Sequence, residues 1–251
     1  CVTHRSFYSY LSNPAFSGEV GEHDFLVRSQ PSLVSFQRII EEYLVLPPSF
    51  WRKEDRDCWG NRIVYGGCRD WHRAFTFQSV GVVECAEYIV PEENPSPLFL
   101  SPTHLTNIAT RLFSNELDGP SPEKICDFVN RSMIYKPEST TVTTTAQEAL
   151  ESGAGVCQDF AHIMVGLCRA KGLPARYVVG MMEGEGATHA WVEVWHEGAW
   201  MAFDPTHNRR ISYGYIKIAH GRDAADCQVC RGLYKGVAKE SNMVKVLMQE
   251  I

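Results

Sequence analysis

The sequence predicts an α+β protein, in which a strand-rich N-terminal part precedes a part that mixes helices and strands. Three observations support this prediction. Residues 1–92 read as strands, a proline-rich stretch interrupts the chain at Pro91–Pro97, and apolar residues recur at helical spacing from Cys157. We therefore expect an N-terminal antiparallel β domain and a second domain built around a buried helix.

The strands of residues 1–92 are predicted from runs of β-branched and aromatic residues. Ile63–Tyr65 is one such run, and others lie between Phe75 and Val90. Gly66-Gly67 and Gly81 are expected to break these strands, because glycine has no side chain to pack in a strand.

A domain boundary is expected after these strands. The prolines of Pro91–Pro97 would deny a continuing strand its amide donors, so this stretch is predicted to be a linker. We place the second domain at residues 98–218, and we expect residues 219–251 to form a C-terminal extension with a final strand.

Three helices are predicted before the buried one. A helical pattern runs over residues 103–117, and another helix should begin at Pro122 with Ser121 as its N-cap. The apolar face of that second helix would comprise Ile125, Phe128, Val129 and Met133. Thr141–Thr145 should be irregular, and a short helix is expected around Ala146–Leu150.

The buried helix is predicted to begin at Cys157 and to end at Lys171-Gly172. Its apolar face would comprise Phe160, Ile163, Met164, Leu167 and Cys168. Unpaired N–H groups and the positive end of the helix dipole favour an anion at a helix start. The thiol of Cys157 is therefore well placed to become a thiolate nucleophile, whereas the deeper Cys168 is assigned to packing.

A hairpin is predicted after this helix. His189–Trp195 and Trp200–Asp204 read as strands, and His196-Glu197-Gly198 reads as the turn between them. If His189 lies opposite Asp204, or one diagonal step away, their Cβ atoms are roughly 5–8 Å apart. The intermediate register would put the two side chains on opposite faces, and the sequence does not fix the register.

Cys157, His189 and Asp204 form the predicted catalytic set, because the order Cys, His, Asp is typical of a papain-like nucleophile. The imidazole would take the thiol proton and return it to a leaving group, and the carboxylate would orient the imidazole. Asp159 and Glu193 are alternative orienting groups. The former is more simply a first-turn acid, and the latter lies on the same strand as His189.

The other histidines are given structural roles. His162 is expected to pack or to make a surface hydrogen bond, and His196 and His207 are expected to be solvated. Asn130-Arg131-Ser132 matches a glycosylation acceptor, which we interpret as a chance match.

Several strings resemble the bacterial transglutaminase-like family. The core strings are Gly155–His162, Gly172–Gly180, His189–Val194 and Phe203–Thr206. Further strings that resemble this family are Asp57–Arg62, His72–Glu84, Ala219–Asp226 and Arg231–Gly236. The resemblance implies a papain-like transglutaminase core, in which the nucleophile helix packs on an antiparallel sheet behind an N-terminal antiparallel β domain. It also supports Cys157, His189 and Asp204 as the catalytic residues.

The chemistry implied is acyl transfer through a thioester acyl-enzyme. The donor would be a peptide, amide or thioester, in one variant bound to a carrier protein, and the acceptor would be an amine or water. The backbone N–H of Cys157 is the first expected oxyanion donor, and Gln158 and Tyr135 are candidates for the second. An amine acceptor is slightly favoured, because a tryptophan-rich hairpin would shield the thioester. The tryptophans concerned are Trp191, Trp195 and Trp200, and core packing remains their simpler interpretation.

Two alternatives stay open. A cysteine protease or amidase would use the same acyl-enzyme with water as the acceptor. A non-catalytic binding module on the same fold is a second alternative, and the intact set of three residue types argues against it.

Composition excludes several other classes. The net charge of −6 and pI of about 5.9 give no basic surface for nucleic acid, and no apolar run is long enough to cross a membrane. The 9 cysteines show no disulfide framework, so a reducing, cytoplasmic location is expected. No cofactor or metal is expected. Cys227-Gln228-Val229-Cys230 lacks the partners of a zinc site, and we interpret it as two incidental cysteines in a loop.

Overall fold

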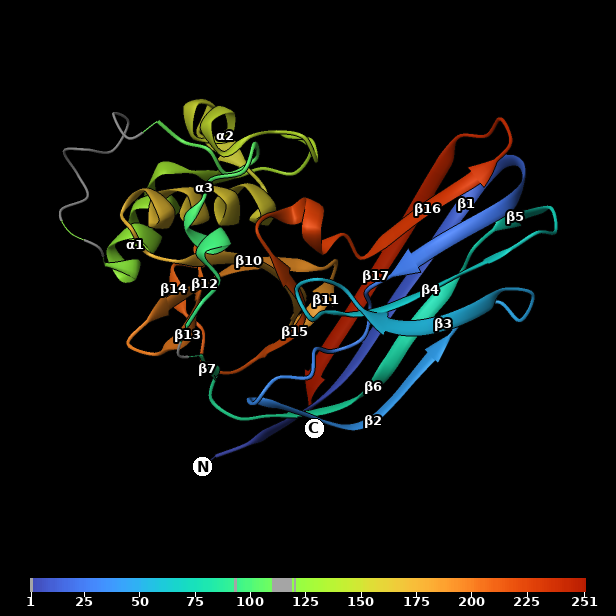
Figure 1. The fold of residues 1–251 in the computed structure, drawn as a ribbon, viewed down its shortest axis with the longest axis horizontal. Coiled ribbons are helices and arrows are strands. Elements are labelled where there is room, and N and C mark those ends of the chain that lie inside the picture. The colour runs from blue at the N-terminus through green and yellow to red at the C-terminus, as the bar shows by residue number, and fades with distance from the viewer. Residues whose placement is uncertain (1, 93, 110–118, 120) are drawn as a thin grey trace.

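The structure is a computed structural model that describes residues 2–92, 94–109, 119 and 121–251. Within these residues the strands form a nine-stranded sheet, a six-stranded sheet and a two-stranded pair. Figure 1 shows the larger sheet standing beside a second unit, in which helices cover the smaller sheet. Among the described helices, none has the length and apolar character needed to cross a membrane.

The elements are distributed as follows. The larger sheet contains β1 (His4–Val27), β2 (Gln37–Val45), β3 (Trp51–Arg56), β4 (Arg62–Cys68), β5 (His72–Ala74), β6 (Phe77–Cys85), β11 (Gly184–Gly186), β16 (Cys230–Lys235) and β17 (Glu240–Glu250). The smaller sheet contains β7 (Ile89–Pro91), β10 (Ala175–Met182), β12 (His189–His196), β13 (Ala199–Asp204), β14 (Arg209–Arg210) and β15 (Tyr215–Gly221). The pair is β8 (Ile134–Tyr135) and β9 (Ala154–Gly155). The helices are α1 (Pro122–Ser132), α2 (Ala146–Ser152) and α3 (Cys157–Ala170), with the 3-10 helices η1 (Pro97–Leu100) and η3 (Ala224–Cys227).

The long strand β1 organises the larger sheet. It pairs with β17 from Ser6 opposite Glu250 to Phe16 opposite Glu240, and with β6 along its other edge. Its later part pairs with β4 and β16. The last strand of the chain therefore joins the sheet that the first strand begins, and the two termini lie near one another (Figure 1).

The predicted N-terminal antiparallel sheet is confirmed, and it also takes in strands from beyond residues 1–92. β11, β16 and β17 join it from later in the chain, while β7 pairs with β13 in the smaller sheet. The division into domains at 1–92, 98–218 and 219–251 stays a prediction. The pairing shows that the chain crosses repeatedly between the two sheets.

Two predicted strand breaks are wrong. β4 runs through Gly66 and Gly67, and β6 runs through Gly81. A Cβ at Gly66 would lie 1.9 Å from the carbonyl oxygen of Trp51, and one at Gly81 would lie 2.1 Å from that of Glu41. These glycines are inside strands because a neighbouring backbone passes too close for any side chain.

Helices α1 and α2 were correctly predicted. The side chain of Ser121 accepts a hydrogen bond from the Lys124 N–H at the start of α1, and Thr145 and Glu148 form a capping box at α2. The helix predicted at 103–117 is wrong over 103–109, and residues 110–117 lie outside the described residues. Thr106 explains the difference, because its hydroxyl accepts a hydrogen bond from the Thr103 N–H and favours a local turn over a helix.

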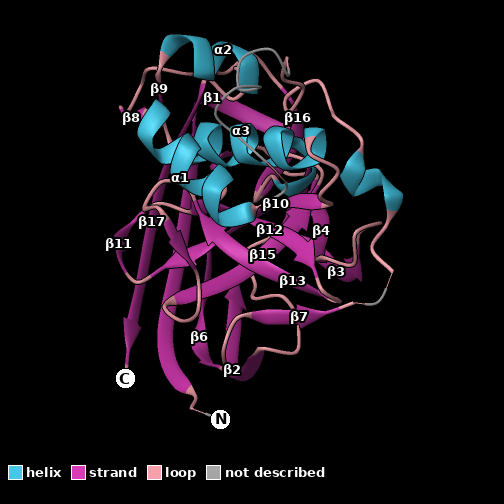
Figure 2. Ribbon diagram, turned by 90° about the vertical axis from the view of Figure 1, so that its left-hand side faces the viewer, coloured by secondary structure: helices cyan, strands magenta, loops and turns pink. Residues whose placement is uncertain are grey.

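The expected packing of the nucleophile helix is confirmed. α3 lies across β10 and β12 of the smaller sheet, and every residue from Asp159 to Arg169 is buried. Figure 2 shows the three α-helices gathered on one side of the strands. This arrangement holds the first residue of α3, Cys157, at the end of a fully packed helix.

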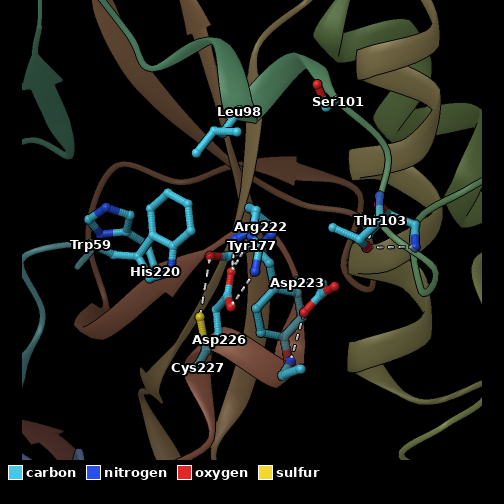
Figure 3. Close-up of polar contacts among 12 residues, drawn as sticks. Trp59, Leu98, Ser101, Thr103, Tyr177, His220, Arg222, Asp223, Asp226 and Cys227 are labelled. Atoms are coloured by element: carbon cyan, nitrogen blue, oxygen red, sulfur yellow. Dashed lines mark hydrogen bonds and ion pairs between the residues drawn. The ribbon is translucent and has the colours of Figure 1, made fainter. Parts of the chain in front are cut away.

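A polar cluster joins η3 to both sheets. The Arg222 guanidinium pairs with Asp226 and lies over the Trp59 ring at 5.4 Å from its centroid (Figure 3). The thiol of Cys227 points to the carbonyl oxygen of Tyr177 at 3.9 Å. Cys227 is buried in η3 and Cys230 begins β16, so the placement of both cysteines in a loop is wrong.

A group of charges is buried in the smaller sheet. Glu193 is fully buried, pairs with Arg176, and accepts hydrogen bonds from the Lys217 ammonium at 2.7 and 2.8 Å. The Tyr88 hydroxyl donates to the same carboxylate at 2.7 Å. Burial alone would raise the pKa of Glu193, but the charges of Arg176 and Lys217 hold it well below its usual value. Glu193 is therefore a structural ion-pair partner.

We predict that Glu193→Ala lowers the free energy of unfolding by about 3–5 kcal/mol, because two buried cations lose their counter-ion. Urea unfolding followed by circular dichroism measures this loss. Glu54→Ala, on the fully exposed strand β3, is the matched control and should change stability by less than about 0.5 kcal/mol. Equal stability of the two variants would contradict the prediction.

Candidate active site

The side chain of Asp159 shapes the entry to α3. It accepts hydrogen bonds from the Val156 N–H at 2.8 Å and from the Thr140 hydroxyl at 2.6 Å. A Cβ at Gly155 would lie 2.7 Å from the Asp159 Cβ, so only glycine fits beside this turn. Asp159 thus acts as the first-turn acid predicted from the sequence, and Cys157 takes the first position of the helix.

His189 and Asp204 are joined across the predicted hairpin. β12 and β13 pair with Val192 opposite Phe203, and this register places His189 one diagonal step from Asp204 on the same face. The His189 Nε2 lies 2.8 Å from the Asp204 carboxylate. Both side chains are buried, with exposed fractions of 8% and 0%.

The imidazole of His189 also reaches the nucleophile candidate. Its Nε2 is occupied by Asp204, so Nδ1 is the nitrogen available for the hydrogen bond to the Cys157 thiol. Burial alone would lower the pKa of His189, but the hydrogen bonds and charges of Asp204 and Cys157 raise it to about 9. The imidazolium form is therefore favoured at neutral pH. This is the form that can protonate a leaving group.

Asp204 is held by more donors than His189 alone. The Tyr215 hydroxyl donates to its Oδ2 at 2.6 Å, and His207 Nδ1 lies 2.8 Å from the same oxygen. The N–H groups of Thr206 and His207 donate to Oδ1 at 3.0 and 3.2 Å. Burial would raise the pKa of Asp204, but the hydrogen bond and charge of His189 hold it far below the usual range. The carboxylate therefore stays ionised and fixed in orientation.

His207, Tyr215 and Asn130 are functional-site residues that sequence reasoning missed. His207 is exposed, as expected, but its ring also bonds Asp204, which the sequence did not indicate. The Asn130 amide donates to the carbonyls of Pro205 and Thr206 at 3.0 Å and so anchors the loop after β13. The position of His207 three residues after Asp204 is the one feature of the sequence that could have indicated its contact with this carboxylate.

A cavity of about 430 Å³ opens at Cys157. Its lining residues are Tyr135, Cys157, Met182–His189, Thr206, His207 and Val246. None of Trp191, Trp195 and Trp200 lines this cavity. Trp191 and Trp200 are fully buried, with the Trp191 ring stacked beside His189 at 6.4 Å between centroids, and the Trp195 indole donates to the carbonyl of Glu92. Trp191 and Trp200 are core aromatics and Trp195 is partly exposed, and since none of them lines the cavity the argument that they shield the thioester is wrong.

The chain is also similar to known proteins. Residues 107–205 match the family model of the transglutaminase-like superfamily, and Cys157, His189 and Asp204 all fall within the match. Over this segment the chain is similar to the transglutaminase-like superfamily. The resemblance predicted from the sequence strings is thereby confirmed.

Individual proteins are similar to larger or smaller parts of the chain. An uncharacterised protein of Mycobacterium tuberculosis is 29% identical over 276 residues, covering 92% of this chain and 86% of that protein. A protein-glutamine gamma-glutamyltransferase of Pseudomonas aeruginosa is 33% identical over 120 residues, covering 41% of this chain and 18% of that enzyme. A crystal structure from Cytophaga hutchinsonii, provisionally described as a cysteine protease, has a TM-score of 0.74 at 22% identity and covers 100% of this chain and 93% of its own. The last comparison supports the fold of this chain.

The candidates for the second oxyanion donor differ in position. Tyr135 lines the cavity of Cys157, whereas Gln158 lines a separate cavity beside Val142 and Ala224. Burial and the neighbouring Cys157 raise the pKa of Tyr135, so its hydroxyl keeps its proton and can donate. Position therefore favours Tyr135 over Gln158.

Glu193, an alternative orienting group, and His162 both have structural roles. Glu193 pairs with Lys217 and Arg176, as described above. His162 is fully buried, and its Nε2 accepts a hydrogen bond from the Ala224 N–H at 3.1 Å. Burial lowers the pKa of His162 to about 4, so the ring is neutral and structural.

His189, Asp204 and His207 are the side chains in the described part of the chain that could surround a metal ion, with ligand atoms within 4.8 Å of one another. A metal would have to replace the protons by which both imidazoles bond the carboxylate. Hydrogen bonding among the three residues already accounts for their proximity.

We predict that Asp204→Asn lowers the pKa of His189, because burial then acts without the opposing carboxylate. The imidazolium is present below a pKa of about 9 in the native protein and is lost as the pH rises through that value. The alkaline limb of the rate profile should therefore move to lower pH, and the maximal rate should fall by roughly 10³–10⁴-fold. NMR titration of His189 and the pH–rate profile test this, with Asp127→Asn as the surface control. An unmoved alkaline limb would contradict the assignment.

Proposed function

We propose that this protein is a cysteine-dependent acyltransferase that forms an amide bond between an acyl donor and an amine. The observation that carries the proposal is the buried Asp204 carboxylate on Nε2 of His189, with Cys157 beside the same imidazole in one cavity. This set supplies a nucleophile, an acid–base and an orienting group in one cavity.

The first half of the reaction acylates the enzyme. The Cys157 thiolate attacks the carbonyl of an amide or thioester and forms a carbon–sulfur bond, with negative charge on the oxygen. The Cys157 N–H and the Tyr135 hydroxyl are the proposed donors to that oxygen. The bond to the leaving group breaks as His189 gives it a proton, which leaves a thioester and a neutral imidazole.

The second half releases the product. An amine attacks the thioester carbonyl, its proton passes to His189, and the carbon–sulfur bond breaks to regenerate the thiolate. Glu183 and Glu185 are among the residues that line the cavity, and their negative charge would favour a cationic amine near Cys157. The similarity to a relative named as a protein-glutamine gamma-glutamyltransferase also supports an amine acceptor.

Hydrolysis is the second candidate function. The segment Gly184–Gly186 on the cavity wall is exposed, so water can reach the thioester. The structural neighbour described provisionally as a cysteine protease has the same fold. A carrier-bound thioester as donor, a cytoplasmic location and a non-catalytic binding module are further hypotheses carried from the sequence.

We predict that Cys157→Ala abolishes acyl transfer and preserves the fold, because alanine is well tolerated in a helix. Turnover of activated esters and thioesters is measured beside circular dichroism. Cys168→Ala, within the same helix but fully buried, should instead reduce stability and keep the acyl-enzyme detectable. Undiminished turnover by Cys157→Ala would remove the nucleophile assignment.

A second prediction separates the acceptors. The acyl-enzyme is trapped and identified by intact mass, and graded concentrations of a simple diamine are then added. Amide product should exceed free acid well beyond the yield of uncatalysed aminolysis, because the carboxylates at the cavity concentrate the amine. If the amide yield never rises above the uncatalysed level, the hydrolase reading replaces the acyltransferase reading.

A further inference from the structure

The strand β11 forms part of the wall beside the candidate nucleophile. Its residues Gly184, Glu185 and Gly186 all line the cavity that contains Cys157 and His189, and all are exposed. β11 lies between β10 and β12 in the sequence, yet it pairs with β17 of the larger sheet. Figure 2 shows β11 next to β17. The catalytic cavity is thus bordered by a strand of the larger sheet.

One edge of β11 is free. Gly184 pairs with Met248 and Gly186 with Val246, and β11 is the terminal strand in the order of the larger sheet. No other strand in the described residues pairs with it. In an antiparallel ladder, residues alternately direct their N–H and C=O groups toward and away from the partner strand. β11 therefore presents unpaired main-chain groups along a cavity wall.

Glycine at position 186 is not required by the fold. A Cβ at Gly184 or Gly186 would meet nothing within 4 Å. Gly184 has a φ of +119°, which explains its lack of a side chain, but Gly186 has no such conformation. The two positions point to the same face of the strand, which leaves a flat backbone surface. Glycine inside a strand is typical of a close approach by another backbone.

The edge of β11 differs from the other fully exposed edge, β3. After Trp51, β3 consists of the charged residues Arg52–Arg56, which is how proteins commonly protect an edge from pairing. β11 carries only Glu185, whose side chain points to the opposite face from the two glycines. The edge beside Cys157 is therefore left open to pairing.

We propose that the free edge of β11 binds the acyl donor as an extended peptide, whose main chain pairs with β11 while its reactive carbonyl lies at Cys157. This inference rests on the proposed function and names its donor class. A peptide supplies alternating N–H and C=O groups that match a strand edge, whereas a lipid-like acyl chain or a flexible carrier arm has no such repeat. Met182 and Val246 provide apolar contacts in the same cavity for donor side chains.

The first test scans the donor backbone. Peptide thioesters of six residues are prepared with single N-methyl groups at successive amides, and KM for acylation is measured. Methylation at amides that pair with β11 should raise KM about tenfold, and the intervening positions should be silent, which gives a period of two residues. A flat scan, or a loss confined to the residue at the reactive carbonyl, overturns the inference.

The second test alters the strand. Gly186→Val should reduce the ratio of kcat/KM for the six-residue donor to that for a one-residue donor about tenfold, because the added side chain lies on the same face as its partner Val246 and occupies the part of the cavity that the donor side chains need. Ser241→Val, an exposed position on β17 outside the cavity, should leave this ratio unchanged. Thermal melts monitor folding, and an unchanged ratio in a folded Gly186→Val protein overturns the inference.

The two proposals fail in distinguishable ways. Acylation of the native protein by a small activated ester is measured first, and its absence overturns the proposed function itself. Normal acylation by the ester together with equal KM for one-residue and six-residue donors overturns only the docking of a peptide on β11.

Discussion

The arrangement of the candidate site depends on one buried carboxylate. Asp204 is removed from water, and its cost of desolvation is offset by donors from His189, His207 and Tyr215 on a single oxygen. Arg209 in turn donates to the Tyr215 hydroxyl at 2.6 and 3.0 Å. The charge of Asp204 keeps His189 protonated, so the acid–base character of the site follows from how this oxygen is satisfied.

The fold supplies the rigid frame that this carboxylate requires. α3 is packed over β10 and β12, which fixes the distance between the helix start and the strand that bears His189. The buried pair of Glu193 and Lys217 reaches across β10 and ties β12 to β15. β11 then links this frame to the larger sheet through β17, so both sheets border the same cavity.

The sequence predicted local features where short-range chemistry decides the structure. Ser121 capped α1 as expected, and Cys157 began a helix with a continuous apolar face. Long-range approach defeated the same reasoning elsewhere. Gly66 and Gly81 lie within strands because a neighbouring backbone, distant in sequence, leaves no room for a side chain.

The sequence by itself determined the residue types of the candidate site, the helix start at Cys157 and the hairpin that bears His189 and Asp204. Only the tertiary structure decided the register of that hairpin, because two registers share one pattern of side chains and differ only in packing. It also decided the roles of His207 and the free edge of β11. Hydrogen bonds to a buried oxygen and the pairing of distant strands depend on proximity in space, which spacing along the chain does not encode.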